Sequence, residues 1–187
     1  MESAASIHFM IVLALGASLP YVTYCSHFTV SSQGTPKDIE NTITQRCDAF
    51  NTVTGSSRSC QGIWKSFTKA FERKGPCKSD FSYSDYFKDT KQTIPSGKTL
   101  LWSGVQAAAM DYSEKCGFVT LGDTLTGCLL TDLTWCGKEE DPGINYETCD
   151  TCRGDIASPS SVFWRQASKN LASESRGVVS VMLSGSN

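Results

Sequence analysis

Nine cysteines within 187 residues constrain this chain more than any other feature of its sequence. They follow an apolar stretch from Ile7 to Val22, which has the length of a secretory hydrophobic region and is short for a helix that spans a bilayer. A chain that enters the secretory route meets an oxidising compartment, where cysteines pair. We therefore expect a scaffold stapled by disulfide bonds.

Residues 1–25 are predicted to be a signal peptide, with cleavage between Ser18 and Ser26. The segment before the apolar stretch contains Glu2 and neither lysine nor arginine, which leaves an uncleaved signal anchor as the alternative. If Cys25 leaves with the signal peptide or stays unpaired, the other eight cysteines form an even set.

Charge and histidine content exclude several classes of function. The net charge is −2 at pH 7, and the 17 basic residues are scattered, so the chain offers no surface for nucleic acid. The two histidines, His8 and His27, lie in the signal segment and directly after it, which argues against a Ser-His-Asp triad or a histidine-ligated metal. Cys136, Cys149 and Cys152 leave a zinc or redox cluster as an alternative to disulfides, but a zinc site needs a fourth ligand, so we expect no metal.

Apolar residues at helical spacing predict that residues 26–176 form a mainly helical portion. The first helix is expected to begin at Thr35-Pro36, with Thr35 as its N-cap, and to run to about Phe50. A second helix should carry Ile63, Trp64, Phe67 and Phe71 on one side and end at Gly75. Further helices are expected over residues 103–115, 123–133 and 160–173, with a long irregular region over 137–160.

Residues 177–187 differ from the rest of the chain. Val178 to Leu183 is a β-branched apolar run that is too short for a helix and is typical of a buried parallel strand. A single strand leaves backbone groups unpaired, so it either pairs with short stretches such as 99–102 and 118–121 or belongs to a sheet with strands outside this sequence. The predicted fold class is α+β or α/β: a mainly helical, disulfide-stapled N-terminal portion, then the first strand of an incomplete parallel-sheet portion.

Five motifs occur in a characteristic order: Thr99-Leu-Leu-Trp-Ser-Gly-Val105, Thr120-Leu-Gly-Asp-Thr-Leu125, Leu133-Thr-Trp-Cys-Gly137, Ser161-Val-Phe-Trp164 and Val181-Met-Leu-Ser-Gly-Ser-Asn187. Together with the cysteine order from Cys47 onward, they resemble the ADP-ribosyl cyclase/NAD glycohydrolase family. The resemblance implies a helical portion packed on a smaller parallel-sheet portion, with the active cleft between them. It also implies an enzyme that splits NAD+ into nicotinamide and either ADP-ribose or cyclic ADP-ribose, a calcium-releasing messenger in the family.

In this interpretation NAD+ is the substrate and no cofactor is required. The protein is expected to be secreted or to lie on the extracellular face of the plasma membrane. Attachment to a membrane, through the N-terminus or a missing C-terminus, stays open, as does a homodimer. The resemblance pairs six cysteines as Cys47–Cys60, Cys77–Cys152 and Cys136–Cys149. Cys116 and Cys128 are extra to the family pattern, and pairing with each other is one option for them.

The resemblance also names substrate-binding residues. The family's cleft tryptophans match Trp102 and Trp164, whose indole faces attract a flat nicotinamide cation, and Ser103 and Ser168 offer hydroxyls toward the nucleotide. Asp123 is a candidate by motif, although an aspartate at the start of a helix is more often a cap. From the residue pattern alone, two buried core tryptophans are the alternative.

The resemblance does not supply a convincing catalytic residue within the sequence. Stabilising the oxocarbenium-like centre needs a carboxylate, and the family's catalytic glutamate lies in an aromatic-Phe-Gly-x-x-Glu segment beyond Asn187. Gly122 stands where the family has a glutamate linked to the balance between cyclisation and hydrolysis, and Thr131 stands where it has an aspartate, with Asp132 beside it. Glu174 is placed at a solvated helix end. The alternative function is therefore a catalytically inactive secreted or cell-surface binding protein on the same scaffold.

Overall fold

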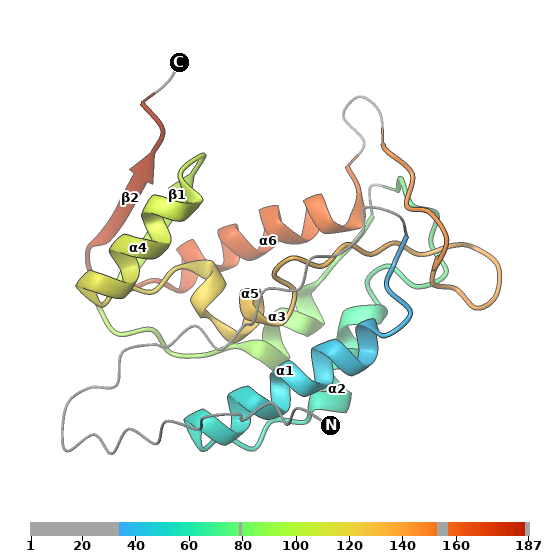
Figure 1. The fold of residues 1–187 in the computed structure, drawn as a ribbon, viewed down its shortest axis with the longest axis horizontal. Helices are drawn as coiled ribbons and strands as arrows, with labels where there is room; N and C mark the ends of the chain where they lie inside the picture. Colours follow the sequence, from blue (N-terminus) through green and yellow to red (C-terminus); the bar gives the residue numbers. More distant parts are fainter. Residues whose placement is uncertain (1–33, 79, 153–156, 186–187) are drawn as a thin grey trace, which may run out of the picture.

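The computed structural model describes residues 34–78, 80–152 and 157–185, and it shows a mainly helical chain with a small parallel sheet (Figure 1). This confirms the predicted fold class. In chain order the elements are α1 (Ile39–Thr54), α2 (Cys60–Thr68), α3 (Ser84–Thr90), β1 (Thr99–Ser103), α4 (Gln106–Cys116), the 3-10 helix η1 (Leu121–Asp123), α5 (Leu125–Cys128), α6 (Pro159–Glu174) and β2 (Val179–Leu183). The predicted signal peptide lies outside the described residues, and the division at residue 176 stays a prediction. Within the described ranges, no helix combines the length and apolar character needed to cross a bilayer.

An aromatic cluster forms the centre of the core, where α2, α3 and α6 meet. Phe163 on α6 lies 5.1 Å from Tyr83, 5.6 Å from Tyr86 and 5.5 Å from Trp135, measured between ring centroids. Phe67 on α2 lies 5.1 Å from Trp135. All five side chains are at most 1% exposed, and burying each is worth roughly 1.5–3 kcal/mol. This cluster fixes α6, which runs across the molecule toward the sheet (Figure 1).

The first helix begins later than its capping pattern predicts. Thr35 is not its N-cap: the hydroxyl Oγ1 donates to the carbonyl of Cys136 at 3.1 Å and accepts from the amide of Cys136 at 2.9 Å. α1 instead follows Asp38, whose side chain makes no capping bond, and continues to Thr54, where Gly55 adopts the left-handed conformation with φ 64°. A long-range pair of hydrogen bonds thus outweighs the local capping signal.

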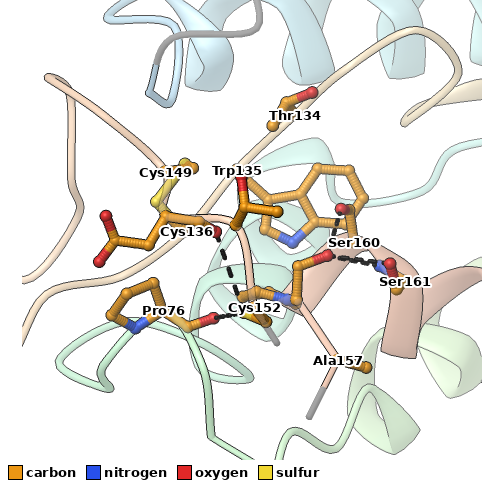
Figure 2. Close-up of a pocket in the computed structure, with 13 residues that line it drawn as sticks. Pro76, Thr134, Trp135, Cys136, Cys149, Cys152, Ala157, Ser160 and Ser161 are labelled. Atoms are coloured by element: carbon orange, nitrogen blue, oxygen red, sulfur yellow. Dashed lines mark hydrogen bonds between the residues drawn. A yellow bond between two sulfur atoms is a disulfide. The ribbon is translucent and has the colours of Figure 1, made fainter. Parts of the chain in front are cut away.

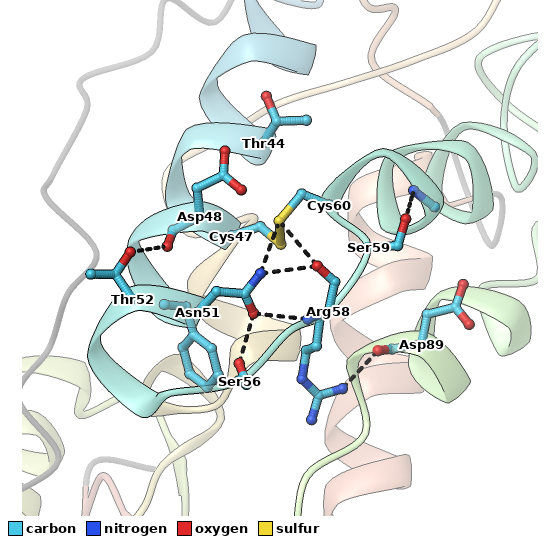
Figure 3. Close-up of a disulfide and its surroundings, with 12 residues drawn as sticks. Thr44, Cys47, Asp48, Asn51, Thr52, Ser56, Arg58, Ser59, Cys60 and Asp89 are labelled. Carbon is cyan, nitrogen blue, oxygen red and sulfur yellow. Dashed lines mark hydrogen bonds between the residues drawn. A yellow bond between two sulfur atoms is a disulfide. The ribbon is translucent and has the colours of Figure 1, made fainter.

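Three disulfides join described residues, and they are the three pairs that the resemblance implies: Cys47–Cys60, Cys77–Cys152 and Cys136–Cys149. The first joins α1 to α2, and beside it Asn51 binds the connecting loop by donating to the carbonyl of Arg58 at 2.9 Å (Figure 3). The option that Cys116 pairs with Cys128 is wrong, because Cys116 is a free, exposed thiol while Cys128 is disulfide-bonded. Cys25 lies outside the described residues, so the expectation for the other eight cysteines, which depends on Cys25, stays a prediction.

The helix expected over residues 123–133 is broken into η1 and the four-residue α5. Thr124 between them is extended, with φ −80° and ψ 153°, and Asp132 has φ 61°. Leu125, Leu129 and Leu133 are nevertheless buried, as their spacing suggests. The prediction was right about which residues form the apolar stripe, but wrong that they lie on one regular helix.

The other helices differ from prediction only at their ends. α4 begins at Gln106 instead of residue 103, because Ser103 ends β1 and Gly104 turns the chain with φ 72°. α6 begins at Pro159, one residue earlier than predicted, and its cap is Ser158: the Ser158 side chain accepts from the amide of Ser161. Proline at the first helical position leaves no amide donor to satisfy.

β2 pairs with β1 in parallel, with Thr99 opposite Val179 and Ser103 opposite Leu183. Of the two alternatives for its pairing, the structure shows the one with residues 99–102. The expectation that β2 is buried is wrong within the described chain, because Val181 is 59% exposed and Leu183 is 65% exposed. The described sheet has two strands, so one edge of β2 has no strand beside it in these ranges.

Candidate active site

A cavity of about 950 Å³ lies beside the carboxyl end of β1. Its walls come from three parts of the chain: the end of β1 with the turn after it, α6, and the irregular region around η1 and α5. Its lining residues are Leu100, Leu101, Trp102, Ser103, Gly104, Gln106, Leu121, Gly122, Thr131, Asp132, Leu133, Thr134, Trp164, Ser168 and Leu171.

The structure brings the two candidate tryptophans to this one cavity. Trp102 belongs to β1 and Trp164 to α6, so the two residues are 62 positions apart in the chain. Both are half-buried. Trp164 packs edge-on against the core residue Phe163, with ring centroids 5.0 Å apart. Two indoles at one opening suit a flat cationic ring, and the alternative that both are buried core tryptophans does not hold.

The two candidate serines line the same cavity. Ser103 is the last residue of β1, and its carbonyl accepts from the amide of Ser184 at 3.2 Å, which ties the ends of the two strands together. Ser168 is four residues after Trp164 on α6, so both side chains share one helix face. Both serines are exposed. Their hydroxyls are therefore accessible to a bound nucleotide.

Asp123 is the one predicted binding residue that does not line the cavity. Its Oδ2 accepts from the amide of Thr120 at 2.8 Å and from the hydroxyl of Thr120 at 2.7 Å. The hydroxyl of Ser113 on α4 lies 3.5 Å from the same oxygen. The carboxylate is thus occupied in starting η1, which is the capping role that its position at the start of a helical turn favours.

Asp132 lines the cavity, although it was not among the predicted binding residues. It is exposed and adopts φ 61°, a left-handed conformation that aspartate tolerates better than most residues. The sequence signal for Asp132 was its place beside Thr131, where the family has an aspartate, and directly before the Leu133-Thr-Trp-Cys-Gly137 motif. Gln106, Thr131 and Thr134 add further polar groups to the lining.

Gly122 lines the cavity without a side chain. A Cβ built on it would meet the Thr120 hydroxyl at 3.7 Å, which is ordinary van der Waals contact. The backbone at Gly122 therefore leaves room for a Cβ.

Glu174 does not line the cavity, in agreement with its assignment to a helix end. It forms an ion pair of 3.0 Å with Lys91.

Below the cavity wall, buried groups hold the irregular region. Burial raises the pKa of Tyr86 well above its usual value, so the phenol stays neutral and donates to the carbonyl of Thr126 at 3.0 Å. Burial also lowers the pKa of Arg46, while the nearby Asp132 carboxylate acts in the opposite direction. A guanidinium remains charged under either influence.

A second, smaller cavity of about 400 Å³ lies near the start of α6 (Figure 2). The Cys136–Cys149 disulfide, Trp135 and the hydroxyls of Ser160 and Ser161 line it, and Thr134 lines both cavities. Cys136, Cys149 and Cys152 are all in disulfides, which excludes the zinc alternative for them. In the part of the chain that the structure describes, no group of three His, Cys, Asp or Glu residues is placed to hold a metal ion.

Comparison with known proteins gives one consistent result. The model of the ADP-ribosyl cyclase family matches residues 36–187. The chain belongs to the ADP-ribosyl cyclase family. It is 36% identical to an ADP-ribosyl cyclase/cyclic ADP-ribose hydrolase of Aplysia californica over 81% of this chain, and 32% identical to ADP-ribosyl cyclase/cyclic ADP-ribose hydrolase 1 of Mus musculus over 95% of this chain.

Solved ADP-ribosyl cyclases have the same fold as this chain. A crystal structure of Aplysia cyclase complexed with its substrate NGD and product cGDPR has a TM-score of 0.72 at 35% identity, and covers 83% of this chain and 64% of its own. A structure of CD38 has a TM-score of 0.74 at 32% identity, and covers 84% of this chain and 67% of its own. The chain spans 56% and 60% of the Aplysia californica and Mus musculus relatives.

Proposed function

We propose that the larger cavity binds NAD+ and that this chain provides the nucleotide-binding part of an NAD+ glycohydrolase/ADP-ribosyl cyclase. Such an enzyme releases nicotinamide and forms ADP-ribose or cyclic ADP-ribose. The observation that carries the proposal is that Trp102 and Trp164, from separate elements, open onto one cavity. The relatives' names and the substrate and product in the Aplysia cyclase crystal support the same chemistry.

The lining suits the nicotinamide end of NAD+. The pyridinium ring is flat and cationic, so an indole face attracts it and excludes water from it. Ser103 and Ser168 offer hydroxyls for the sugar or phosphate oxygens beside the ring. Leu100, Leu121 and Leu171 supply the apolar surface that a base needs, which gives the cavity the mixed character of a small-molecule site.

The glycosidic step needs a further group. Breaking the bond between nicotinamide and ribose builds positive charge on the sugar, and a carboxylate facing that charge stabilises it. Asp132 is the carboxylate among the lining residues of the described chain, and it stands at the exposed edge of the wall. We assign the step to the family's glutamate segment, which the 187-residue sequence does not contain. In this assignment Trp102 and Trp164 bind and orient NAD+, and the glutamate segment carries out the cleavage of the glycosidic bond.

Binding and turnover separate this proposal from its alternative, an inactive binding protein on the same scaffold. The 187-residue chain, produced with its disulfides, is titrated with NAD+ while tryptophan fluorescence is recorded. We expect quenching, with Trp164→Ala weakening the binding about tenfold through the lost cation–π and packing contacts. Trp64→Phe is the matched control, because Trp64 lies on α2 and does not line the cavity.

Turnover is then followed with a fluorogenic NAD analogue. We expect none from the 187-residue chain, and activity once the family's C-terminal part is appended. Hydrolysis by the chain alone would contradict the assignment of the step to that part. Binding that stays unproductive in the extended protein would favour the inactive binding protein.

The disulfides fit an oxidising, extracellular environment. We propose secretion or display on the extracellular face of the plasma membrane.

A further inference from the structure

The side chain of Arg46 crosses from α1 to the irregular wall of the cavity. It is 6% exposed, and its Nη1 donates to three carbonyls: Thr131 at 2.8 Å, Leu129 at 3.0 Å and Cys128 at 3.2 Å. These carbonyls end α5 and the turn after it, where no further helical turn provides donors. One buried cation thus satisfies the C-terminal end of this short helix, with the charge sign that a helix end favours.

The bond to Thr131 matters most for the cavity. The carbonyl of Thr131 belongs to the peptide that carries the amide of Asp132, and Asp132 is the residue with φ 61°. Fixing that peptide plane therefore fixes the direction in which the chain leaves the turn. The next residues, through Thr134, form the cavity wall. Left-handed backbone at a non-glycine residue persists only where its surroundings hold it.

Other side chains hold the opposite end of α5. Tyr86 donates to the carbonyl of Thr126 at 3.0 Å, and the hydroxyls of Thr90 and Thr126 lie 2.8 Å apart. The side-chain oxygen of Gln92 accepts from the amide of Leu125 at 2.7 Å. These contacts from α3 and the loop after it secure the start of α5, whereas Arg46 secures the exit toward Asp132.

We infer that Arg46 is a positioning residue for the nucleotide cavity. The Arg46 side chain does not line the cavity, but it holds residues 131–134 in the conformation that gives the wall its shape. This inference rests on the proposed function for the identity of the ligand, but its structural part does not. If it is correct, losing Arg46 weakens NAD+ binding beyond what the accompanying loss of stability explains.

The test compares Arg46→Met with Tyr86→Phe in the 187-residue chain. Tyr86→Phe removes one buried hydrogen bond to a carbonyl within α5, whereas Arg46→Met removes three, at the end of α5 and in the turn after it. Hydrogen–deuterium exchange of peptides covering residues 131–134 is measured first. We expect faster exchange there in Arg46→Met and unchanged exchange in Tyr86→Phe.

NAD+ affinity is then measured by tryptophan fluorescence. We expect it to fall about tenfold in Arg46→Met, which is the size of effect that unsatisfied buried carbonyls produce. Tyr86→Phe should stay within about twofold.

Equal losses of affinity in the two variants would show that Arg46 only stabilises the fold, and unchanged exchange at 131–134 in Arg46→Met would overturn the inference directly. If Arg46→Met fails to fold, Arg46→Lys takes its place: an ammonium keeps the charge but not the guanidinium geometry, so the same two effects should appear in smaller size. If the parent chain does not bind NAD+, the proposed function fails, and the exchange measurement alone still decides whether Arg46 positions the wall.

Discussion

The two long walls of the cavity are built in different ways. Trp164 and Ser168 stand on α6, a regular helix of 16 residues whose buried side is packed into the aromatic core. The wall from Leu121 to Thr134 consists of a 3-10 turn, a four-residue helix and a left-handed turn. The helical wall is a regular helix held mainly by packing, whereas the irregular wall combines buried leucines with side-chain bonds to its backbone carbonyls. Substitutions in the two walls should therefore destabilise the protein for different physical reasons.

The largest expected effect is on the helical wall. Phe163→Ala removes a fully buried ring that contacts Tyr83, Tyr86 and Trp135, so we expect a loss of about 3–5 kcal/mol in the free energy of unfolding. Chemical denaturation measures it. Arg165→Ala, at an exposed position on the same helix, should change stability by less than about 0.5 kcal/mol. A loss below about 1 kcal/mol in Phe163→Ala would mean that packing does not hold this wall.

A smaller effect is expected on the irregular wall, where the backbones of η1 and α5 approach each other closely. A Cβ at Gly127 would clash with the carbonyl oxygen of Leu121, so Gly127→Ala forces η1 and α5 apart. We expect it to cost about 1–3 kcal/mol. Gly122→Ala is the matched control, because a Cβ there has room, and it should be neutral to within about 0.5 kcal/mol. Thermal unfolding of both variants checks this, and equal losses would show that the close approach is not what fixes the wall.

The same difference explains what the sequence could predict. The helical wall follows from local rules: apolar spacing places α6 within one or two residues, with Trp164 and Ser168 on one face. Trp102 and Ser103 were identified through the family motif, since spacing alone does not distinguish a cavity tryptophan from a core one. That the two walls face one cavity emerges only in three dimensions.

The irregular wall could not be predicted from local rules. Leucines at helical spacing favoured one helix over 123–133, but the backbone there is set by bonds from residues more than 80 positions away, such as Arg46 to Thr131. Asp123 was offered as a ligand through the family motif, although its bonds to Thr120, three positions earlier, form a local capping box. Thr35 failed as a cap for a different reason, because its partner Cys136 lies 101 positions along the chain.

The smallest expected effect tests charge on the irregular wall without disturbing its backbone. Gly122→Glu places a carboxylate where the wall has open space, on the cavity that we propose for the nicotinamide cation. Because the site is open to water, the attraction should be about 0.5–1 kcal/mol, which is a two- to fivefold tighter binding of NAD+. Gly122→Gln supplies the same shape without the charge and should not show this gain. Tryptophan fluorescence at two ionic strengths decides between them, since added salt screens an exposed charge and should reduce the advantage of the glutamate. A gain of equal size in both variants, insensitive to salt, would mean that the added side chain acts by filling space, and that the ligand presents no positive charge to this part of the wall.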